Sequence, residues 1–184
     1  MKIERAWAMP NRNTFSVKPI RDFILEELPE GTIIDPFANS CKIADITNDL
    51  DPQYDTDYHL DALDFLKTFV PESVDMVLFD PPYTPRQVAE VYKKLGKTVD
   101  METTQMSYWS KLKTEIARIT KPNGKCLSFG WNSSGVGKKN GFKIERILIV
   151  CHGSQHNDTI CVADRKVQCG LTAFSKRVRI DQNE

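Results

Sequence analysis

Residues 74–83 read VDMVLFDPPY, a short apolar run of strand-forming residues that stops at an aspartate. A run of this length and composition predicts a buried β-strand. Asp80, Pro81, Pro82 and Tyr83 follow directly, and open α/β sheets hold their ligands at the carboxyl ends of their strands. We therefore expect this strand at the centre of an α/β sheet, with chemically active groups at its end.

The four residues after the run combine hydrogen-bond acceptors with an aromatic ring. Two consecutive prolines lack an N–H and fix φ, so their carbonyls lie at set angles beside the Asp80 carboxylate. Such acceptors suit a conjugated –NH₂ group, whose lone pair becomes nucleophilic when both of its hydrogens are held. Asp80 and the Pro81 carbonyl would hold them while Tyr83 stacks on the ring that carries the amine. The plainer alternative is that these residues only end a strand and turn the chain.

The composition predicts one globular domain over residues 1–184. Hydrophobic residues make up 40% of the chain and charged residues 27%, which is typical of a domain with its own core. No apolar run approaches 18 residues, and Lys2, Glu4 and Arg5 precede any apolar stretch. We therefore expect a cytoplasmic protein without a signal peptide or a membrane partner.

The five cysteines favour free thiols over disulfides, because their number is odd and no two are close in sequence. A zinc site is the alternative for a cluster within twenty residues that comprises Cys151, His152, His156, Cys161 and Cys169. Since no Cys-x-x-Cys spacing is present and two of the cysteines lie in strand-like runs, we expect ordinary strands and no metal.

The two halves of the chain carry opposite charge. Residues 1–92 contain 8 Lys and Arg against 17 Asp and Glu, and residues 93–184 contain 17 against 8. A basic half suits a polyanion and an acidic half suits a cationic cofactor, whereas an ordinary solvated surface would explain the same numbers.

A second strand end is expected at Ile33-Ile34-Asp35, followed by a turn over residues 36–40 and a helical start at 42–44. Doubly wound sheets hold the polar part of a cofactor at such a junction. Neither Gly-x-Gly-x-x-Gly nor Gly-x-x-x-x-Gly-Lys is present, which disfavours dinucleotides and triphosphates.

Two further aspartates lie at the ends of expected elements. Asp49 comes after a short strand at 46–48, where it would accept hydrogen bonds from ribose hydroxyls. Asp61 precedes Ala62 and a short helix, so it is either a contact for an adenine amino group or an ordinary helix cap.

The remaining segments complete an alternation of helices and strands. We expect residues 1–14 to be irregular and 122–124 to form a turn, with an antiparallel pair at 144–151 and 159–163 on the sheet edge. The other predicted elements are helices near 19–28, 84–95 and 108–119 and a strand at 126–129.

Taken in order, these motifs resemble the S-adenosylmethionine-dependent amino-methyltransferases, of the adenine-specific DNA type common in phages and mobile elements. Residues 35–40 are similar to the family's Asp-Pro-Phe-x-Gly-x-Gly cofactor motif, and residues 80–83 match its Asp-Pro-Pro-Tyr motif. Residues 15–19 resemble its Thr-x-Lys-Pro segment. The resemblance extends over nearly the whole chain, from about residue 5 to residue 170.

The resemblance implies an α/β, doubly wound, Rossmann-like fold of class I, with a mostly parallel seven-stranded sheet and a reversed last strand. It implies direct in-line methyl transfer to the amino group of a flipped-out adenine, without a metal. Asp80, Pro81, Pro82 and Tyr83 would be catalytic. The implied contacts to S-adenosylmethionine are Phe15, Lys18, Pro19, Asp35, Pro36, Phe37, Asn39, Ser40, Asp49, Asp61 and Ala62.

The chain departs from the family in two places. Asn39 replaces the first motif glycine, and the second glycine is also absent, although asparagine tolerates left-handed backbone better than most residues. Only 18 residues separate Asp61 from Asp80, too few for a target-recognition domain. We expect a short or degenerate recognition site, or a second subunit, either a homodimer partner or an accessory specificity subunit. The candidate DNA contacts are Arg86, Lys93, Lys94, Trp131, Lys138 and Lys139.

Two other functions remain open at this point. The same acceptor chemistry serves amino groups in RNA or in cytosine, although cytosine-specific relatives more often carry serine where this chain has Asp80. A non-catalytic nucleic-acid-binding module on the same fold is the alternative from another class.

Overall fold

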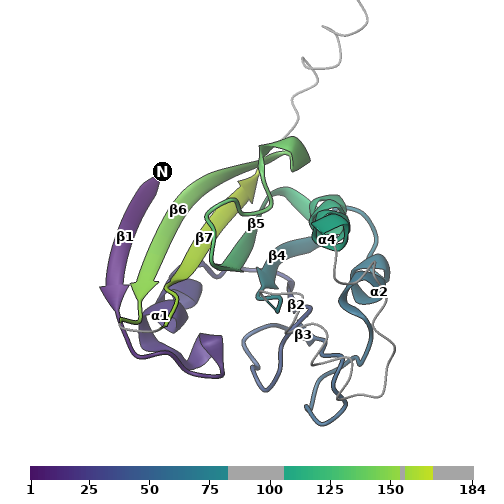
Figure 1. Ribbon diagram of the computed structural model, residues 1–184. Helices are drawn as coiled ribbons and strands as arrows, with labels where there is room; N and C mark the ends of the chain where they lie inside the picture. Colours follow the sequence, from purple (N-terminus) through teal and green to yellow (C-terminus); the bar gives the residue numbers. More distant parts are fainter. Residues whose placement is uncertain (83–105, 154–155, 168–184) are drawn as a thin grey trace, which may run out of the picture.

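The computed structural model describes residues 1–82, 106–153 and 156–167, and its centre is one seven-stranded sheet (Figure 1). The strand order is β1-β6-β7-β5-β4-β2-β3. Only β7 is reversed: it runs antiparallel to β5 and β6, while all other neighbours are parallel. The predicted mostly parallel sheet with a reversed last strand is thus confirmed. The strands are β1 (Lys2–Trp7), β2 (Ile33–Asp35), β3 (Ile46–Thr47), β4 (Val74–Phe79), β5 (Thr120–Gly130), β6 (Phe142–Cys151) and β7 (Thr159–Lys166).

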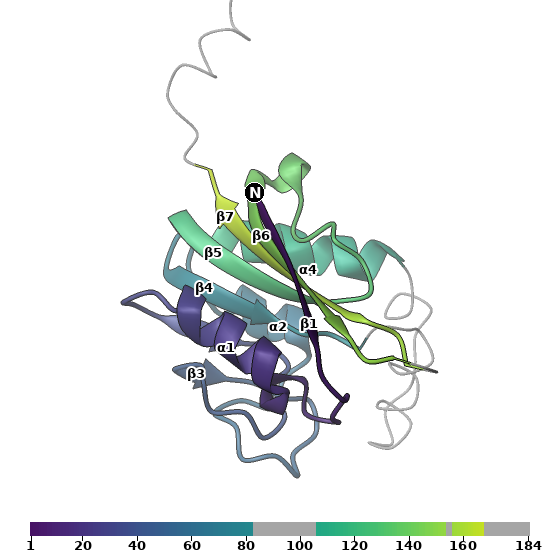
Figure 2. The ribbon, with the colours of Figure 1, turned by 90° about the vertical axis from the view of Figure 1, so that its left-hand side faces the viewer.

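Helices cover both faces of the sheet (Figure 2). One face packs on α1, and the other packs on α2 and α4. The helices are η1 (Thr14–Ser16), α1 (Lys18–Glu27), α2 (Ala62–Lys67), α4 (Met106–Ile119) and η2 (Lys138–Asn140). The helix predicted at 84–95 lies outside the described residues. Within those residues, no helix is long and apolar enough to cross a membrane.

The central strand β4 is buried on both faces, as its sequence predicts. Met76 and Leu78 pack with α1, where Phe23 and Ile24 are also buried. On the other face Val77 belongs to the cluster formed with α2 and α4. β4 therefore lies inside the sheet, between β5 and β2, and Asp80, Pro81 and Pro82 follow at its carboxyl end.

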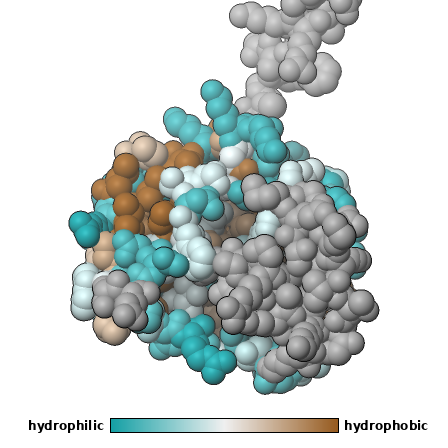
Figure 3. Space-filling model, viewed as in Figure 1, coloured by the Kyte–Doolittle hydropathy of each residue, from teal (hydrophilic) through white to brown (hydrophobic). Residues whose placement is uncertain are grey.

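The N-terminal segment is a strand, and the expectation of an irregular segment over residues 1–14 is wrong for its first half. β1 pairs in parallel with β6 from Lys2 opposite Arg146 to Trp7 opposite Cys151. Because charged residues interrupt its short alternation, the pattern is weak in sequence, and the pairing with β6 supplies the order. Figure 3 shows hydrophobic surface on the side formed by β1 and β6, where Ile3 is 59% exposed. The β6–β7 pair is therefore covered by β1 and does not form the sheet edge.

The passage from β2 to β3 contains no helix, so the helical start predicted at 42–44 is wrong. The chain instead folds back onto the end of β3. The Ala38 N–H donates to the Asn48 carbonyl at 2.9 Å, and the Cys41 N–H donates to the Ala38 carbonyl at 2.8 Å. These bonds hold residues 36–45 as a compact turn between two parallel strands.

Asp164 of β7 is a buried carboxylate that holds the loop between β5 and β6. Its Oδ2 accepts the Val136 N–H at 2.6 Å, and Oδ1 has no hydrogen-bond partner within the described residues. Gly135 adopts φ +52°, and a Cβ there would lie 1.9 Å from the Asp164 Oδ2, so the approach requires glycine. Burial raises the pKa of Asp164 to about 6, against the Val136 hydrogen bond and the Lys113 charge.

We expect Asp164→Asn to remove part of the pH dependence of stability. Well below pH 4 the carboxyl is protonated in both states, whereas above pH 6 the unfolded chain ionises it freely and the folded chain only at a cost. The wild-type free energy of unfolding should therefore lose up to about 3 kcal/mol, relative to Asp164→Asn, as pH rises from 4 to 7. Urea unfolding at several pH values measures this, and parallel profiles for the two proteins would contradict it.

Candidate functional site

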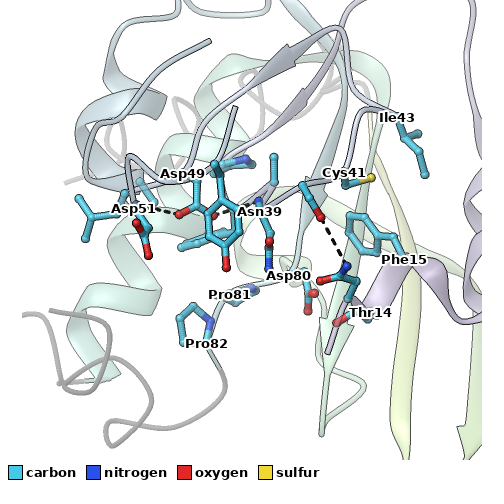
Figure 4. A pocket seen from close by; sticks show the side chains of 18 of the residues that line it. Thr14, Phe15, Asn39, Cys41, Ile43, Asp49, Asp51, Asp80, Pro81 and Pro82 are labelled. Atoms are coloured by element: carbon cyan, nitrogen blue, oxygen red, sulfur yellow. Dashed lines mark hydrogen bonds between the residues drawn. The ribbon is translucent and has the colours of Figure 1, made fainter. Parts of the chain in front are cut away.

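A cavity of about 870 Å³ lies at the carboxyl ends of β2, β3 and β4 (Figure 4). The strand order reverses here, since β3 lies on one side of β2 and β4 on the other, and α/β sheets bind ligands at such a point. The volume is in the range of small-molecule and cofactor sites. Its walls come from residues 12–16, 21, 36–43, 49–51, 54, 60–62, 80–82 and 108–109.

The turn after β2 is held by Asn39 and Asp49. Asn39 has φ +52°, and its N–H donates to Asp49 Oδ2 at 2.9 Å, so the expected tolerance of asparagine for left-handed backbone is confirmed. The other oxygen, Oδ1, accepts the Asp51 N–H, also at 2.9 Å. Asp49 thereby joins the turn after β2 to the turn after β3, and all three residues line the cavity.

The side chain of Asn48 connects the turn after β2 to the segment before α2. Its side chain is fully buried, and Nδ2 donates to the carbonyls of Pro36 and Leu60, both at 3.0 Å. Oδ1 accepts the Leu60 N–H at 2.9 Å. Pro36 and Leu60 each lie twelve residues from Asn48 in the sequence. The three hydrogen bonds of this one buried amide therefore hold the two sides of the cavity at a fixed separation.

Asp35, at the end of β2, lies beneath the cavity and does not line it. Its side chain is 1% exposed, Oδ1 accepts the Phe37 N–H at 2.9 Å, and Oδ2 has no hydrogen-bond partner within the described residues. Burial raises the pKa of Asp35 well above its ordinary value, and the charges of Asp80 and Asp49 raise it further. Burial of this oxygen without a donor favours the neutral form of the Asp35 carboxyl.

Asp49 also carries an altered proton affinity. Burial raises its pKa, while hydrogen bonds from the backbone N–H groups of Asp51 and Asn39 act in the opposite direction. The neighbouring Asp51 charge raises it further, and His59 lowers it. A cationic ligand would relieve this crowding of carboxylates.

Asp61 caps α2 and lines the cavity at once. Its Oδ1 accepts the Leu63 N–H at 2.9 Å, which is the cap expected from sequence. The Tyr108 hydroxyl donates to the same carboxylate, at 2.9 Å from each oxygen. Since the cap and the tyrosine fix its position, any adenine contact of Asp61 would use the remaining lone pairs.

The acceptor cluster predicted after β4 opens into the cavity. Asp80, Pro81 and Pro82 all line it, whereas Tyr83 lies outside the described residues. Figure 4 shows Asp80 near Thr14 and Phe15, on the side away from Asp49 and Asp51. The cavity therefore has an acidic end at the tips of β2 and β3 and an acceptor cluster at the tip of β4.

The segment from η1 into α1 supplies the wall beside Asp80. Phe15 is buried to 7% exposure, lines the cavity and packs on Phe129 with ring centroids 4.7 Å apart. Neither Lys18 nor Pro19 is among the lining residues, although both were predicted contacts. Lys18 is exposed and pairs with Asp22, and Arg21 of the same helix lines the cavity instead.

The predicted DNA contacts lie in different places. Arg86, Lys93 and Lys94 are outside the described residues. Trp131 follows β5 at the cavity end of the sheet, whereas Lys138 and Lys139 belong to η2 at the opposite end, beside the start of β6 (Figure 1). The structure therefore brings only Trp131 of the described candidates near the cavity.

Several lining residues were missed in the sequence. Asp51 and Tyr54 belong to the acid-rich loop after β3, where Asp49 alone was selected. A segment without a recognisable motif supplies Arg12, Asn13 and Thr14. Trp109 belongs to a helix face whose spacing predicts core packing rather than a ligand contact. Only the spacing of Asp49 and Asp51 carried a usable signal.

The described cysteines and acids form no metal centre. Cys41, Cys126, Cys151 and Cys161 are free thiols, as expected. Across the parts of the chain that the structure describes, no group of three His, Cys, Asp or Glu side chains is arranged to hold an ion.

No protein-family model matches the sequence, and no curated protein matches it. The fold does match solved structures. These include a 1,6-didemethyltoxoflavin-N1-methyltransferase from Burkholderia thailandensis with bound 1,6-didemethyltoxoflavin and S-adenosylhomocysteine, at 10% identity and a TM-score of 0.54, covering 82% of this chain and 78% of that one.

Two further matches have longer chains. SMU.776, complexed with S-adenosylhomocysteine, is 11% identical with a TM-score of 0.54, covering 80% of this chain and 48% of that one. TrmN from Thermus thermophilus is 16% identical with a TM-score of 0.50, covering 82% and 49%. This chain thus spans about half the length of each. From its sheet order, its reversed strand and these matches, the chain has the Rossmann-like fold of class I S-adenosylmethionine-dependent methyltransferases.

Proposed function

We propose that this protein transfers a methyl group from S-adenosylmethionine to the exocyclic amino group of adenine in DNA. The observation that carries the proposal is one cavity in which Asp80, Pro81 and Pro82 face the carboxylates at the tips of β2 and β3. A methyl donor and an amine can therefore be held in the same space, with the amine at the acceptor cluster.

The residues present fit the proposed cofactor. Its sulfonium group is cationic, and the carboxylates of Asp49 and Asp51 line the cavity. Arg12 and Arg21 line the same cavity and would receive the carboxylate. When bound, the cofactor supplies an electrophilic methyl group.

The chain's own part in the reaction is to make the amine a nucleophile. The Asp80 carboxylate and the Pro81 carbonyl would accept its two hydrogens and draw the nitrogen towards tetrahedral geometry. Pro81 and Pro82 restrict the backbone that carries both acceptors, so little backbone reorganisation would accompany the reaction. In duplex DNA the adenine must leave the stack, which costs a few kcal/mol.

Incorporation of tritiated methyl groups tests the function directly. We expect label from S-adenosylmethionine in DNA, and N6-methyladenine after digestion of the product to nucleosides. Label in RNA alone, or in cytosine, would replace the proposed substrate and leave the methyltransferase chemistry intact. An absence of label in DNA, RNA and free nucleosides would contradict the proposal altogether.

A further inference from the structure

One face of the sheet is only partly covered by helices. Leu148 and Val150 of β6 pack with α1 on one side. Ile147 and Ile149 alternate with them and therefore point to the opposite side. On that side, the buried cluster formed with α2 and α4 includes residues of β2, β4 and β5, but only Phe142 of β6 and no residue of β1 or β7. Within the described residues, the cover that the helices give this face therefore ends near β5.

Four isoleucines from three strands form an apolar surface beyond that cover. Ile3 of β1 pairs with Ile147, and Ile149 pairs with Ile160 of β7, so all four side chains lie on the same side of the sheet. Ile3 is 59% exposed, and Ile149 and Ile160 are half-buried. We call this surface the isoleucine face, and Figure 3 shows hydrophobic surface over β1 and β6. An apolar surface beside an edge strand favours association with a further segment.

Arg5 marks the limit of the isoleucine face towards the cavity end of the sheet. It pairs with Ile149 and is exposed. Its Nε donates to the Cys151 Sγ at 2.9 Å, which directs the guanidinium along the strands and away from Ile3. A segment that covers the face should therefore be apolar along its length and carry an acid at the end that meets Arg5.

The sequence after β7 has this pattern. Leu171, Phe174 and Val178 stand at positions i, i+3 and i+7, which share one side of a helix. Asp181 follows Val178 by three residues and lies on the same side. These four residues belong to 168–184, outside the described residues, so the match is one of sequence spacing.

The end of β7 brings this segment within reach of the isoleucine face. The Val167 N–H donates to the Gly141 carbonyl at 2.8 Å, so the chain leaves the sheet beside the start of β6. Ile160 lies seven residues back along β7, about 23 Å at the rise of a strand. Three residues of turn span up to about 10 Å and a helix over 171–181 about 15 Å, which together match this distance.

We propose that residues 168–181 fold back over the sheet as a helix that packs Leu171, Phe174 and Val178 on the isoleucine face. Asp181 then lies at the end of the face where Arg5 is exposed. The inference does not depend on the proposed methyl transfer. While the segment is bound, this face is closed to a second subunit, and any specificity subunit would bind elsewhere on the molecule.

Thiol labelling of the whole 184-residue chain tests the inference. Ile3→Cys places a thiol on the isoleucine face, and Lys2→Cys places the matched control on the opposite face of the same strand. With N-ethylmaleimide, and peptide mass spectrometry to separate these thiols from the native ones, residue 3 should label about 10- to 150-fold more slowly than residue 2. Phe174→Asp should remove most of this difference. Ile180→Asp should not, because Ile180 lies on the other side of the proposed helix from Leu171.

Equal labelling of residues 2 and 3 without further substitution, or equal effects of Phe174→Asp and Ile180→Asp, would overturn the inference. Protection of residue 3 that is lost on dilution would also overturn it and assign the face to a second copy of the chain, since cover by the same chain does not depend on concentration. Cys126 and Cys161 are buried and report loss of the fold in the same samples. Asp181→Lys, a milder change, should raise the labelling of residue 3 about two- to fivefold, so the test does not depend on one variant.

Discussion

Asp80→Ala should lower the rate of methyl transfer by about 10²- to 10³-fold, the effect of removing one pre-positioned group from a transition state. The alanine removes the acceptor that holds one hydrogen of the amine, and Pro81 alone cannot align the lone pair. Binding of S-adenosylhomocysteine should change little, because that product lacks the transferred methyl group and the proposed role of Asp80 is to hold the amine. Single-turnover kinetics and calorimetry measure the two effects separately.

Asp80→Asn separates acceptor from charge. Its amide oxygen still accepts a hydrogen bond, so this variant should keep far more activity than Asp80→Ala. If both variants were as slow as each other, the negative charge rather than the acceptor geometry would carry the role. Full activity in Asp80→Ala would remove Asp80 from the reaction.

Asp49→Ala should weaken binding of S-adenosylhomocysteine about 10- to 150-fold, the range for loss of a hydrogen bond to a charged group. The carboxylate holds the N–H groups of Asn39 and Asp51 and lines the cavity, where the proposed cofactor would contact it. Without it, both the ligand contact and the positions of two turns are lost. Titration calorimetry gives the affinity.

The control for this variant is Asp64→Ala, since Asp64 is an exposed acid of α2 outside the cavity. It should bind the ligand as wild type does. Wild-type affinity in Asp49→Ala would exclude Asp49 from the cofactor site. A thermal melt of each variant would show whether a loss of affinity merely reflects a less stable fold.

The sequence predicts the central layer well because its signals there are local. The apolar run of β4 and the spacing of Ile20, Phe23 and Ile24 in α1 leave few alternatives, and burial in the structure agrees with both. The same holds for Asp80, Pro81 and Pro82, whose place at a strand end follows from the run before them.

The sequence fails where long-range contacts decide the structure. β1 is a strand because β6 lies beside it, and residues 42–44 are not helical because the turn bonds to the end of β3. The same limit applies to Arg21 and Lys18. Both are basic residues at the start of one helix, and only the packing of α1 on the sheet selects Arg21 for the cavity.

The helix-free passage from β2 to β3 bears on which molecules compete for this site in a cell. Nucleotide-binding sheets usually cradle phosphate with amides at the start of a helix at this position. Here the N–H groups of Phe37, Ala38 and Asn39 are already bonded to Asp35, Asn48 and Asp49. The phosphates of ATP or NAD would therefore meet N–H groups that already donate hydrogen bonds within the protein, and carboxylates that repel them. Occupancy of the cavity should therefore depend on nucleosides without phosphates. The ratio of the methyl donor to its demethylated product, rather than the ratio of ATP to ADP, would then control how much of the protein is active.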